Sequence, residues 1–354
     1  MLWDIFCKVI DNHGDIGVCW RLAAQLADRG EQVRLWVDDA RALQWMAPRG
    51  HPGVSVRGWT PQAPFDEPGD VVIEAFGCQL DASFLASIAA ASLRRAAQPV
   101  WINLEYLTAE PFAQRSHGLP SPVMHGPSAG LVKHFFYPGF TEGTGGLLRE
   151  PHLMARAAAF RPAEWLAARG LSGDERRVSL FCYEPPGLRD FLAARAQGPG
   201  RTRVMVTAGR ATQATRTAID TDPALAAPSS ALRVSWLHYV DQPAFDELLW
   251  ACDFNFVRGE DSLVRALWAG RPFVWHVYPQ HDDAHHAKLL AFLDWLDAPR
   301  SLREFHLAWN GFGGKLPAFD LAPWQECVHH ARARLLAQDD LVTQLLRFTA
   351  PRNP

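Results

Sequence analysis

The stretch DFNFVRGEDSLVRALWAGRPFVWHVYPQ, which ends at Gln280, constrains the fold of this chain more than any other. An apolar run of strand type is followed by the turn Arg258-Gly259. Three side chains that suit the first turn of a helix come next: Glu260, Asp261 and Ser262. An apolar helical face then leads to Gly270, which stands where glycine ends a helix. The spacing predicts strand, turn, short helix and second strand.

Such a unit is a candidate nucleotide site. The free N–H groups and the dipole of a helix N-terminus favour phosphate, and open α/β sheets bind nucleotides at the carboxyl ends of their strands. An ordinary strand-turn-helix unit with solvated charges at its cap fits the same spacing. The pattern alone leaves both interpretations open.

The bulk composition excludes several classes of protein. With 354 residues, 48% hydrophobic and 21% charged, we expect a globular chain of two domains. A net charge of −3 argues against non-specific nucleic-acid binding. No apolar run is long enough for a transmembrane helix, and the opening MLWDIFCKVI is not a signal peptide. Six scattered cysteines without a CxxC motif indicate reduced thiols in a cytoplasmic protein.

The first half of the chain predicts a parallel sheet. A strand at 3–10, a helix at 18–29 and a strand at 33–37 form a βαβ start. The further elements expected are strands at 54–59, 71–76 and 99–104 and helices at 84–97 and 151–169. Residues 107–150 show no clear elements of their own, but their aromatic content argues against disorder.

The α/β pattern restarts near Gly173. Strands are expected at 178–183, 204–207 and 234–237, and helices at 188–196, 242–252, 284–296 and, once or twice, within 326–348. The segment 210–231 is weakly patterned and is expected to be partly loop. We infer two α/β domains, 1–165 and 172–354, with strand-end loops at a shared cleft. The last helices can pack back on the first domain.

Two carboxylates in the loop after the first strand are candidate catalytic groups. Asp11 and Asp15 lie four residues apart beside two glycines, which allow the backbone to approach a ligand closely. Neighbouring carboxylates can have separated pKa values, so one of them can act as a base. A turn-forming role for Asp11 explains its presence equally well.

Two other groups of polar residues are open to interpretation. Glu105 ends a strand, as a site carboxylate or as a solvated strand end. A histidine and aspartate cluster suggests a metal, but its spacing fixes no third ligand, so a solvated helix start is the better interpretation. The cluster is His281, Asp282, Asp283, His285 and His286.

Four aromatic residues fall near expected strand ends in the second half: Phe181, Tyr183, Tyr239 and Phe245. Each alone is explained by core packing. As a set converging on the turn at Glu260, they predict a slot for a nucleobase.

Three stretches together resemble one family: DIFCKVIDNHGDIGVCWRLA (4–23), HFFYPGFTEGTGGLLRE (134–150) and NFVRGEDSLVRALWAGRPFVWHVYPQ (255–280). The chain is similar, over essentially its whole length, to the bacterial protein-arginine rhamnosyltransferases that mature elongation factor P, the EarP family. The resemblance implies a GT-B architecture, in which two Rossmann-like domains face a central cleft. It implies transfer of rhamnose, with inversion, from dTDP-β-L-rhamnose to an arginine of elongation factor P, without a metal or other cofactor.

The resemblance also implies roles for particular residues. The essential carboxylates would be Asp11, Asp15 and Glu260, with Arg258 beside the last. Tyr183, Asp261 and Ser262 would hold the diphosphate of the donor, and Gln242 the nucleotide. The thymine would be framed by Phe181, Tyr239 and Phe245.

The chemistry of arginine fits this set. A guanidinium has a pKa above about 12 and is a poor nucleophile, so its charge must be localised and a proton removed. Carboxylates can do both, and we expect Asp15 to be the base and Asp11 to orient the acceptor. Glu260 beside a diphosphate would be repelled, so we expect it to bind hydroxyls of the ribose or sugar. N–H groups at Asp261-Ser262 would stabilise the leaving diphosphate.

Other functions remain as alternatives. A GT-B enzyme with a different nucleotide sugar or acceptor fits the aromatic set equally. A non-catalytic nucleotide-sugar-binding protein would not need the acidic pair. An oxidoreductase is disfavoured, because the GxGxxG fingerprint is absent.

Overall fold

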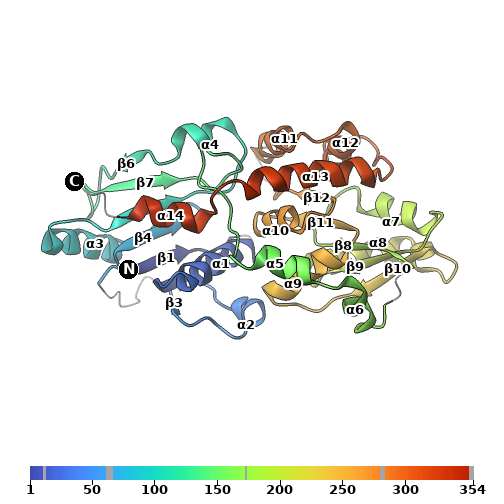
Figure 1. The fold of residues 1–354 in the computed structure, drawn as a ribbon, viewed down its shortest axis with the longest axis horizontal. Coiled ribbons are helices and arrows are strands. Elements are labelled where there is room, and N and C mark those ends of the chain that lie inside the picture. The colour runs from blue at the N-terminus through green and yellow to red at the C-terminus, as the bar shows by residue number, and fades with distance from the viewer. Residues whose placement is uncertain (11–12, 61–66, 172–173, 280–283, 351–354) are drawn as a thin grey trace. The chain divides into compact units, whose positions relative to one another are not determined.

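The computed structural model describes residues 1–10, 13–60, 67–171, 174–279 and 284–350. The chain divides into two α/β units (Figure 1), one formed by Met1–Glu150 with Leu335–Pro354 and the other by Pro151–Arg334. The sequence placed the division later, between 165 and 172. The structure assigns residues 151–165 to the second unit, where Trp165 packs against the core cluster that contains Met205.

The sheet of the first unit has, in the described part of the chain, the strand order β3-β2-β1-β4-β5-β7-β6. Its parallel strands are β1 (Leu2–Cys7), β2 (Gln32–Val37), β3 (Val54–Gly58), β4 (Val71–Ala75), β5 (Val100–Leu104) and β7 (Val132–Phe136). The edge strand β6 (Pro120–Pro122) runs antiparallel to β7. The unit also contains helices α1 (Gly14–Asp28), α2 (Leu43–Met46), α3 (Ala82–Arg95), α4 (Pro111–Ser116) and α14 (Leu341–Thr349).

Strand β1 is buried on both faces, as its apolar run predicts. Successive side chains of a strand point to opposite faces. Trp3 and Ile5 therefore join the core under α1 and α14, whereas Phe6 packs on the other face with Phe84 of α3. Helices on both faces leave the carboxyl edge of the sheet as the place for polar groups.

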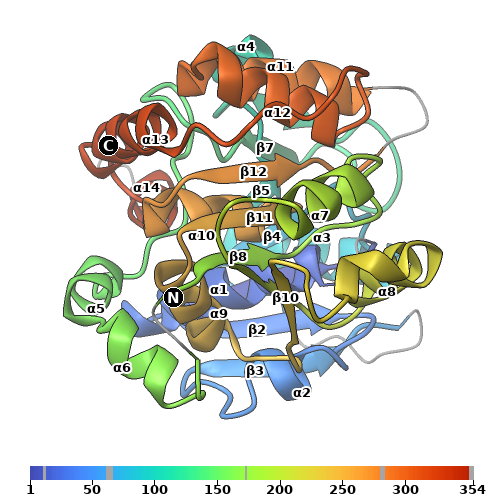
Figure 2. The same ribbon diagram turned by 90° about the vertical axis from the view of Figure 1, so that its right-hand side faces the viewer.

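The second unit has a parallel sheet in the order β10-β9-β8-β11-β12. Figure 2 shows β11 between β8 and β12. Its strands are β8 (Arg176–Leu180), β9 (Thr202–Val206), β10 (Leu232–Trp236), β11 (Phe254–Arg258) and β12 (Phe273–His276). Its helices are α5 (Leu153–Ala159), α6 (Pro162–Ala167), α7 (Leu188–Ala196), α8 (Arg210–Thr221), the 3₁₀ turn η1 (Pro223–Ala226), α9 (Gln242–Ala251), α10 (Asp261–Ala269), α11 (Ala284–Leu296) and α12 (Arg300–Trp309). Helix α13 (Leu321–Leu336) crosses the division between the units.

Aromatic rings fill one side of the second sheet. Phe256 of β11 stacks on Trp309 of α12 with a centroid distance of 4.0 Å, and Phe254 contacts Trp324 of α13 at 5.7 Å. Such pairs add to the free energy of burial. They also fix α12, a helix that was not predicted from the sequence, against strand β11.

The stretch around Gly270 folds as its pattern predicts. Strand β11, helix α10 and strand β12 follow one another, and Leu263 and Leu267 of the helix are buried. Gly270 adopts a φ of 66° at the end of α10, the left-handed conformation that favours glycine. A bidentate buried ion pair joins α10 to α9: Arg265 donates from Nε and Nη2 to the carboxylate of Asp246, each at 2.7 Å.

Three expectations need correction. Residues 107–150 contain α4, β6 and β7, and the sequence VKHFF forms β7 by pairing with β5 and β6. The segment 210–231 begins with the twelve-residue helix α8, whose narrow buried face is Ala211, Thr215 and Ala218. The helix expected at 151–169 is broken into α5 and α6 because Pro162 lacks an N–H and disfavours helix in the residue before it.

Gly270 supplies a test of the helix end. We expect Gly270→Ala to lower the free energy of unfolding by about 1–2 kcal/mol, the cost of a left-handed alanine. The added Cβ would also lie 2.3 Å from Nη1 of Arg332, so that side chain must move. Gly200→Ala is the matched control, since a Cβ there meets no atom within 4 Å and φ is not left-handed. Equal urea midpoints for the two variants would contradict this account.

Candidate functional site

The carboxyl edge of the second sheet gathers aromatic and cationic side chains. Phe181 and Tyr183 follow β8, Arg258 ends β11 and His276 ends β12. The carboxyl ends of parallel strands meet at one edge, which is where open α/β sheets bind ligands. The helices that begin there, α8, α9 and α10, bring further polar residues to the same edge.

Arg258 is the most unusual of these residues. Its side chain is only 7% exposed, and Cζ lies 4.6 Å from the ring centre of Phe181 and 4.5 Å from that of Tyr183. Nη1 donates to the carbonyl of Cys182 at 3.4 Å. Within the part of the chain that the structure describes, the guanidinium forms no ion pair, although its charge helps, after Arg210, to lower the pKa of Glu184. A buried charge without a direct ion pair is costly, so this arrangement suits an anionic ligand.

The turn between β11 and α10 is fixed by side chains. Ser262 Oγ accepts from the backbone N–H of Arg258 at 2.9 Å and donates to its carbonyl oxygen. Glu260 is the N-cap residue of α10, and its Oε1 lies 2.5 Å from Nζ of Lys288 on α11. Lys288 was not predicted as a site residue, because it lies 28 residues from Glu260 and no local sequence pattern indicates a contact over that separation.

The predicted nucleobase residues form a partial frame. The rings of Phe181 and Phe245 meet edge to face at 5.5 Å. Gln242 is buried in the first turn of α9, which Asp241 caps by accepting from the N–H of Ala244 at 2.9 Å. Tyr239 is 49% exposed, so its ring is open to a ligand.

Tyr183 stands at the centre of the edge. It is fully buried, its ring lies 4.7 Å from Cζ of Arg210, and it meets the rings of His276 and Tyr278 edge to face. Its N–H donates to Nδ1 of His276 at 3.3 Å, which leaves the proton of a neutral imidazole on Nε2. Burial, then Arg258 and Arg210, lower the pKa of His276 to about 3. The imidazole is therefore neutral near pH 7.

The histidine and aspartate cluster that suggested a metal lies partly outside the described residues. His281, Asp282 and Asp283 lie outside the described residues, and His285 packs its ring on His286 at 4.3 Å. Among the residues that are described, no three His, Cys, Asp or Glu side chains could hold a metal ion. All six cysteines are buried and unpaired, as expected of core thiols.

The acidic loop belongs to the first unit. Asp11 lies outside the described residues. Asp15 is 6% exposed, and its Oδ2 accepts from the N–H of Ile10 at 2.9 Å. Helix α1 begins at Gly14, four residues earlier than predicted, so Asp15 lies in the first turn, where the helix dipole favours a negative charge. Glu105, half-buried at the end of β5, accepts from Nδ2 of Asn103, and burial raises its pKa.

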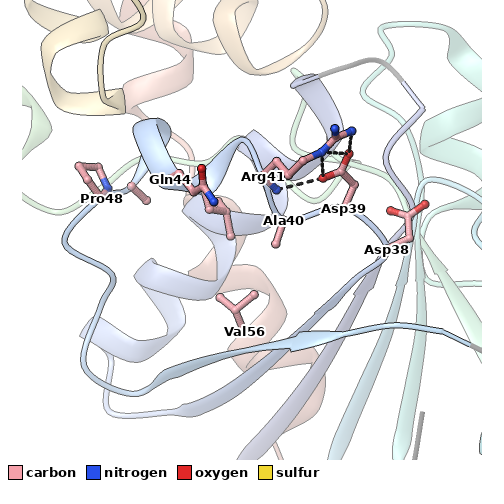
Figure 3. Close-up of a pocket in the computed structure, with 9 residues that line it drawn as sticks. Asp38, Asp39, Ala40, Arg41, Gln44, Pro48 and Val56 are labelled. Carbon is pink, nitrogen blue, oxygen red and sulfur yellow. Dashed lines mark hydrogen bonds and ion pairs between the residues drawn. The ribbon is translucent and has the colours of Figure 1, made fainter. Parts of the chain in front are cut away.

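A pocket of about 770 Å³ opens at the carboxyl end of β2 (Figure 3). Its lining is Asp38, Asp39, Ala40, Arg41, Leu43, Gln44, Ala47, Pro48 and Val56. Asp38 accepts from the N–H of Val9 at 2.9 Å, which ties the pocket to the segment before Asp15. Hydrogen bonds from Arg41 lower the pKa of Asp39 to about 2. No pattern in the sequence predicts this pocket.

Comparison with known proteins decides the family. Residues 3–350 match the model of the elongation factor P rhamnosyltransferase EarP. The chain belongs to the EarP family. It is 43% identical to a protein-arginine rhamnosyltransferase of Pseudomonas putida and 40% identical to one of Pseudomonas aeruginosa, in each case over 98% of both chains. No helix in the described part of the chain is both long and apolar enough to cross a membrane.

Solved structures agree with this membership. A structure described as the basis for EarP-mediated arginine glycosylation of elongation factor EF-P matches with a TM-score of 0.65 and 32% identity, over 98% of both chains. The spinosyn rhamnosyltransferase SpnG, complexed with thymidine diphosphate, matches with a TM-score of 0.51 and 15% identity over 98% of both chains, which shows the fold alone. The predicted GT-B class is confirmed, and this chain is a glycosyltransferase.

His276 gives the second unit a pH dependence. Its pKa of about 3 in the folded chain is below the roughly 6.5 of an unfolded histidine. The unfolded state therefore binds the extra proton, and stability present above pH 6.5 is lost as the pH falls toward 3. We expect His276→Asn, which keeps an acceptor for Tyr183, to reduce this loss by up to about 1.4 kcal/mol per pH unit.

Urea unfolding between pH 7 and pH 4 measures this effect. His330→Asn is the control, because His330 is an exposed histidine on α13. Parallel stability curves for the native chain and His276→Asn would show that the buried imidazole does not titrate as described.

Proposed function

We propose that this protein transfers rhamnose from dTDP-β-L-rhamnose to an arginine side chain of elongation factor P, with inversion at the anomeric carbon. Support comes from the curated relatives named protein-arginine rhamnosyltransferase and from the EarP structure described with EF-P. A translation-factor acceptor and six buried free thiols also support action in the cytoplasm. We propose no metal, cofactor, nucleic acid or membrane as a partner.

The proposed donor site rests on the buried guanidinium of Arg258, which forms no ion pair with any residue that the structure describes. It lies two residues before the N-cap of α10, and the N–H groups of a first helical turn favour phosphate oxygens. The diphosphate would supply the anion that Arg258 lacks. Phe181 and Phe245 would frame the thymine, with Tyr239 and Gln242 at the nucleoside.

The ion pair with Lys288 changes the reasoning about Glu260. An isolated carboxylate at this turn would repel a diphosphate, but Nζ of Lys288 compensates the charge. Glu260 can then lie beside the donor and accept hydrogen bonds from hydroxyls of the ribose or sugar. Ser262 would act mainly through the turn that it closes with Arg258.

The acceptor chemistry belongs to the acidic loop. As a guanidinium nitrogen attacks the anomeric carbon, the bond from that carbon to the diphosphate oxygen breaks. The proton released from the nitrogen would pass to Asp15, and Asp11 would orient the guanidinium. The departing dTDP would take the negative charge, which Arg258 and the N–H groups of α10 would stabilise.

Intact-mass analysis tests the transfer. After incubation of elongation factor P with the protein and dTDP-rhamnose, we expect a gain of one deoxyhexose. Asp15→Asn should abolish most of the rate, by a factor of about 10²–10⁴ for a lost general base. Asp28→Asn, at the other end of α1, should retain it.

Two outcomes would contradict the proposal. No mass gain with elongation factor P, although the donor binds, would redirect the search to another acceptor. Preferential binding of a different nucleotide sugar would replace the donor. Full activity of Asp15→Asn would show that Asp15 is not the base, while the proposed donor and acceptor would stand.

The Glu260–Lys288 pair can be tested by a double-mutant cycle on donor affinity. We expect Glu260→Gln to weaken donor binding by about tenfold or more, because charged hydrogen bonds to hydroxyls are lost. Lys288→Met should also weaken it, since Glu260 would then repel the diphosphate. The double variant should lose less than the sum of the two effects.

Calorimetry with dTDP-rhamnose gives the four affinities. Lys315→Met, at an exposed lysine of the same unit, is the control for lost positive charge. If the effects of the two substitutions on the binding free energy are strictly additive, or if Glu260→Gln leaves the donor affinity unchanged, Glu260 does not contact the donor as proposed.

A further inference from the structure

A second arginine lies on the ring that contacts Arg258. Arg210 is the first residue of α8, and its Cζ is 4.7 Å from the ring centre of Tyr183, compared with 4.5 Å for Arg258. The preceding Gly209 has a φ of 88°, and a Cβ there would lie 3.3 Å from the hydroxyl of Tyr239. The start of α8 is thus placed against the donor edge by a conformation that favours glycine.

The two arginines differ in their partners. Glu184, four residues beyond the end of β8, accepts both Nε (2.8 Å) and Nη2 of Arg210, and these bonds hold the pKa of Glu184 below its usual range. Both side chains are accessible, 38% for Arg210 and 53% for Glu184. Exposed ion pairs of this kind contribute little to stability and exchange partners readily.

A diphosphate carries more negative charge than the single positive charge of Arg258 can balance. Lys288 is already paired with Glu260, and Asp261 adds a further carboxylate at the start of α10. His276 is neutral near pH 7, since its pKa is about 3. Arg210 is a nearby cation, and it is paired with an exposed carboxylate that a ligand can displace. The fork that binds Glu184 fits phosphate oxygens equally well.

We propose that Arg210 is a second cation for the diphosphate of the donor, and that Glu184 holds its guanidinium until the phosphate oxygens displace the carboxylate. The inference rests on the proposed function for the identity of the nucleotide only. It assigns Arg210 to direct contact with substrate and Glu184 to a positioning role that competes with the substrate.

The proposal predicts opposite effects for the two partners. Arg210→Gln removes a charged fork, so nucleoside diphosphate affinity should fall by about tenfold or more. Glu184→Gln removes the competing carboxylate, so affinity should rise by about two- to fivefold at low salt. When Arg210→Gln is already present, Glu184→Gln should have no further effect. Arg210→Lys, with its charge but no fork, should lie between the native chain and Arg210→Gln.

Calorimetry on the full chain measures these affinities for dTDP, UDP, GDP and thymidine. Arg216→Gln is the matched control, because Arg216 is an exposed arginine on the same helix. Thymidine, which has no phosphate, should bind all variants equally. A change below twofold in Arg210→Gln, or weaker diphosphate binding in Glu184→Gln, would overturn the proposal.

The same data separate this inference from the proposed donor. The affinity of each variant is compared with that of the native chain for the nucleoside diphosphate that the native chain binds most tightly. Preference for UDP or GDP would overturn the dTDP assignment, while the Arg210 ratio would still decide the second cation. Native chain that binds no nucleoside diphosphate would overturn both.

Discussion

The buried ion pair between Arg265 and Asp246 fixes the part of the molecule on which the donor site depends. Both side chains are 2% exposed, and the two parallel hydrogen bonds satisfy the fork of the guanidinium and both carboxylate oxygens. Loss of one partner would leave an uncompensated buried charge. Helix α10 carries the turn with Glu260, and α9 begins with Gln242, so this internal contact joins the two helices that carry residues of the proposed donor site.

Charge compensation at the carboxyl edge is nearly complete before any ligand binds. Lys288 neutralises Glu260, Glu184 neutralises Arg210, and the imidazole of His276 is uncharged near pH 7. Arg258 is buried and forms no ion pair with the described residues. A site of this kind is preorganised, because the groups that would stabilise a leaving diphosphate need no rearrangement when charge develops. Only the exposed pair at Arg210 would exchange partners.

Most of the architecture could be predicted because its elements have local causes. The apolar runs of β1 and β11 and the stop at Gly270 are visible in the sequence and lie where predicted. Helix α8 was under-predicted because a three-residue buried face of alanine and threonine is a weak signal. Strand β7 was missed because five residues with Lys133 and His134 among them show no clear alternation, and its pairing with β5, Ile102 with His134, joins residues 32 positions apart. The early start of α1 was missed because its N-cap His13 has no capping side-chain bond.

The sequence by itself determined the two α/β units, the strand-turn-helix around Gly270, the family and the candidate carboxylates, since these depend on residues close together in the chain. Tertiary structure alone decided which charges meet. Lys288 reaches Glu260 across 28 residues, and His276 receives the N–H of Tyr183 across 93. Strand order sets these contacts: β8 lies beside β11, and β11 beside β12, although two other strands intervene in the chain between β8 and β11. Local patterns do not specify such neighbours, because backbone pairing and core packing select them together.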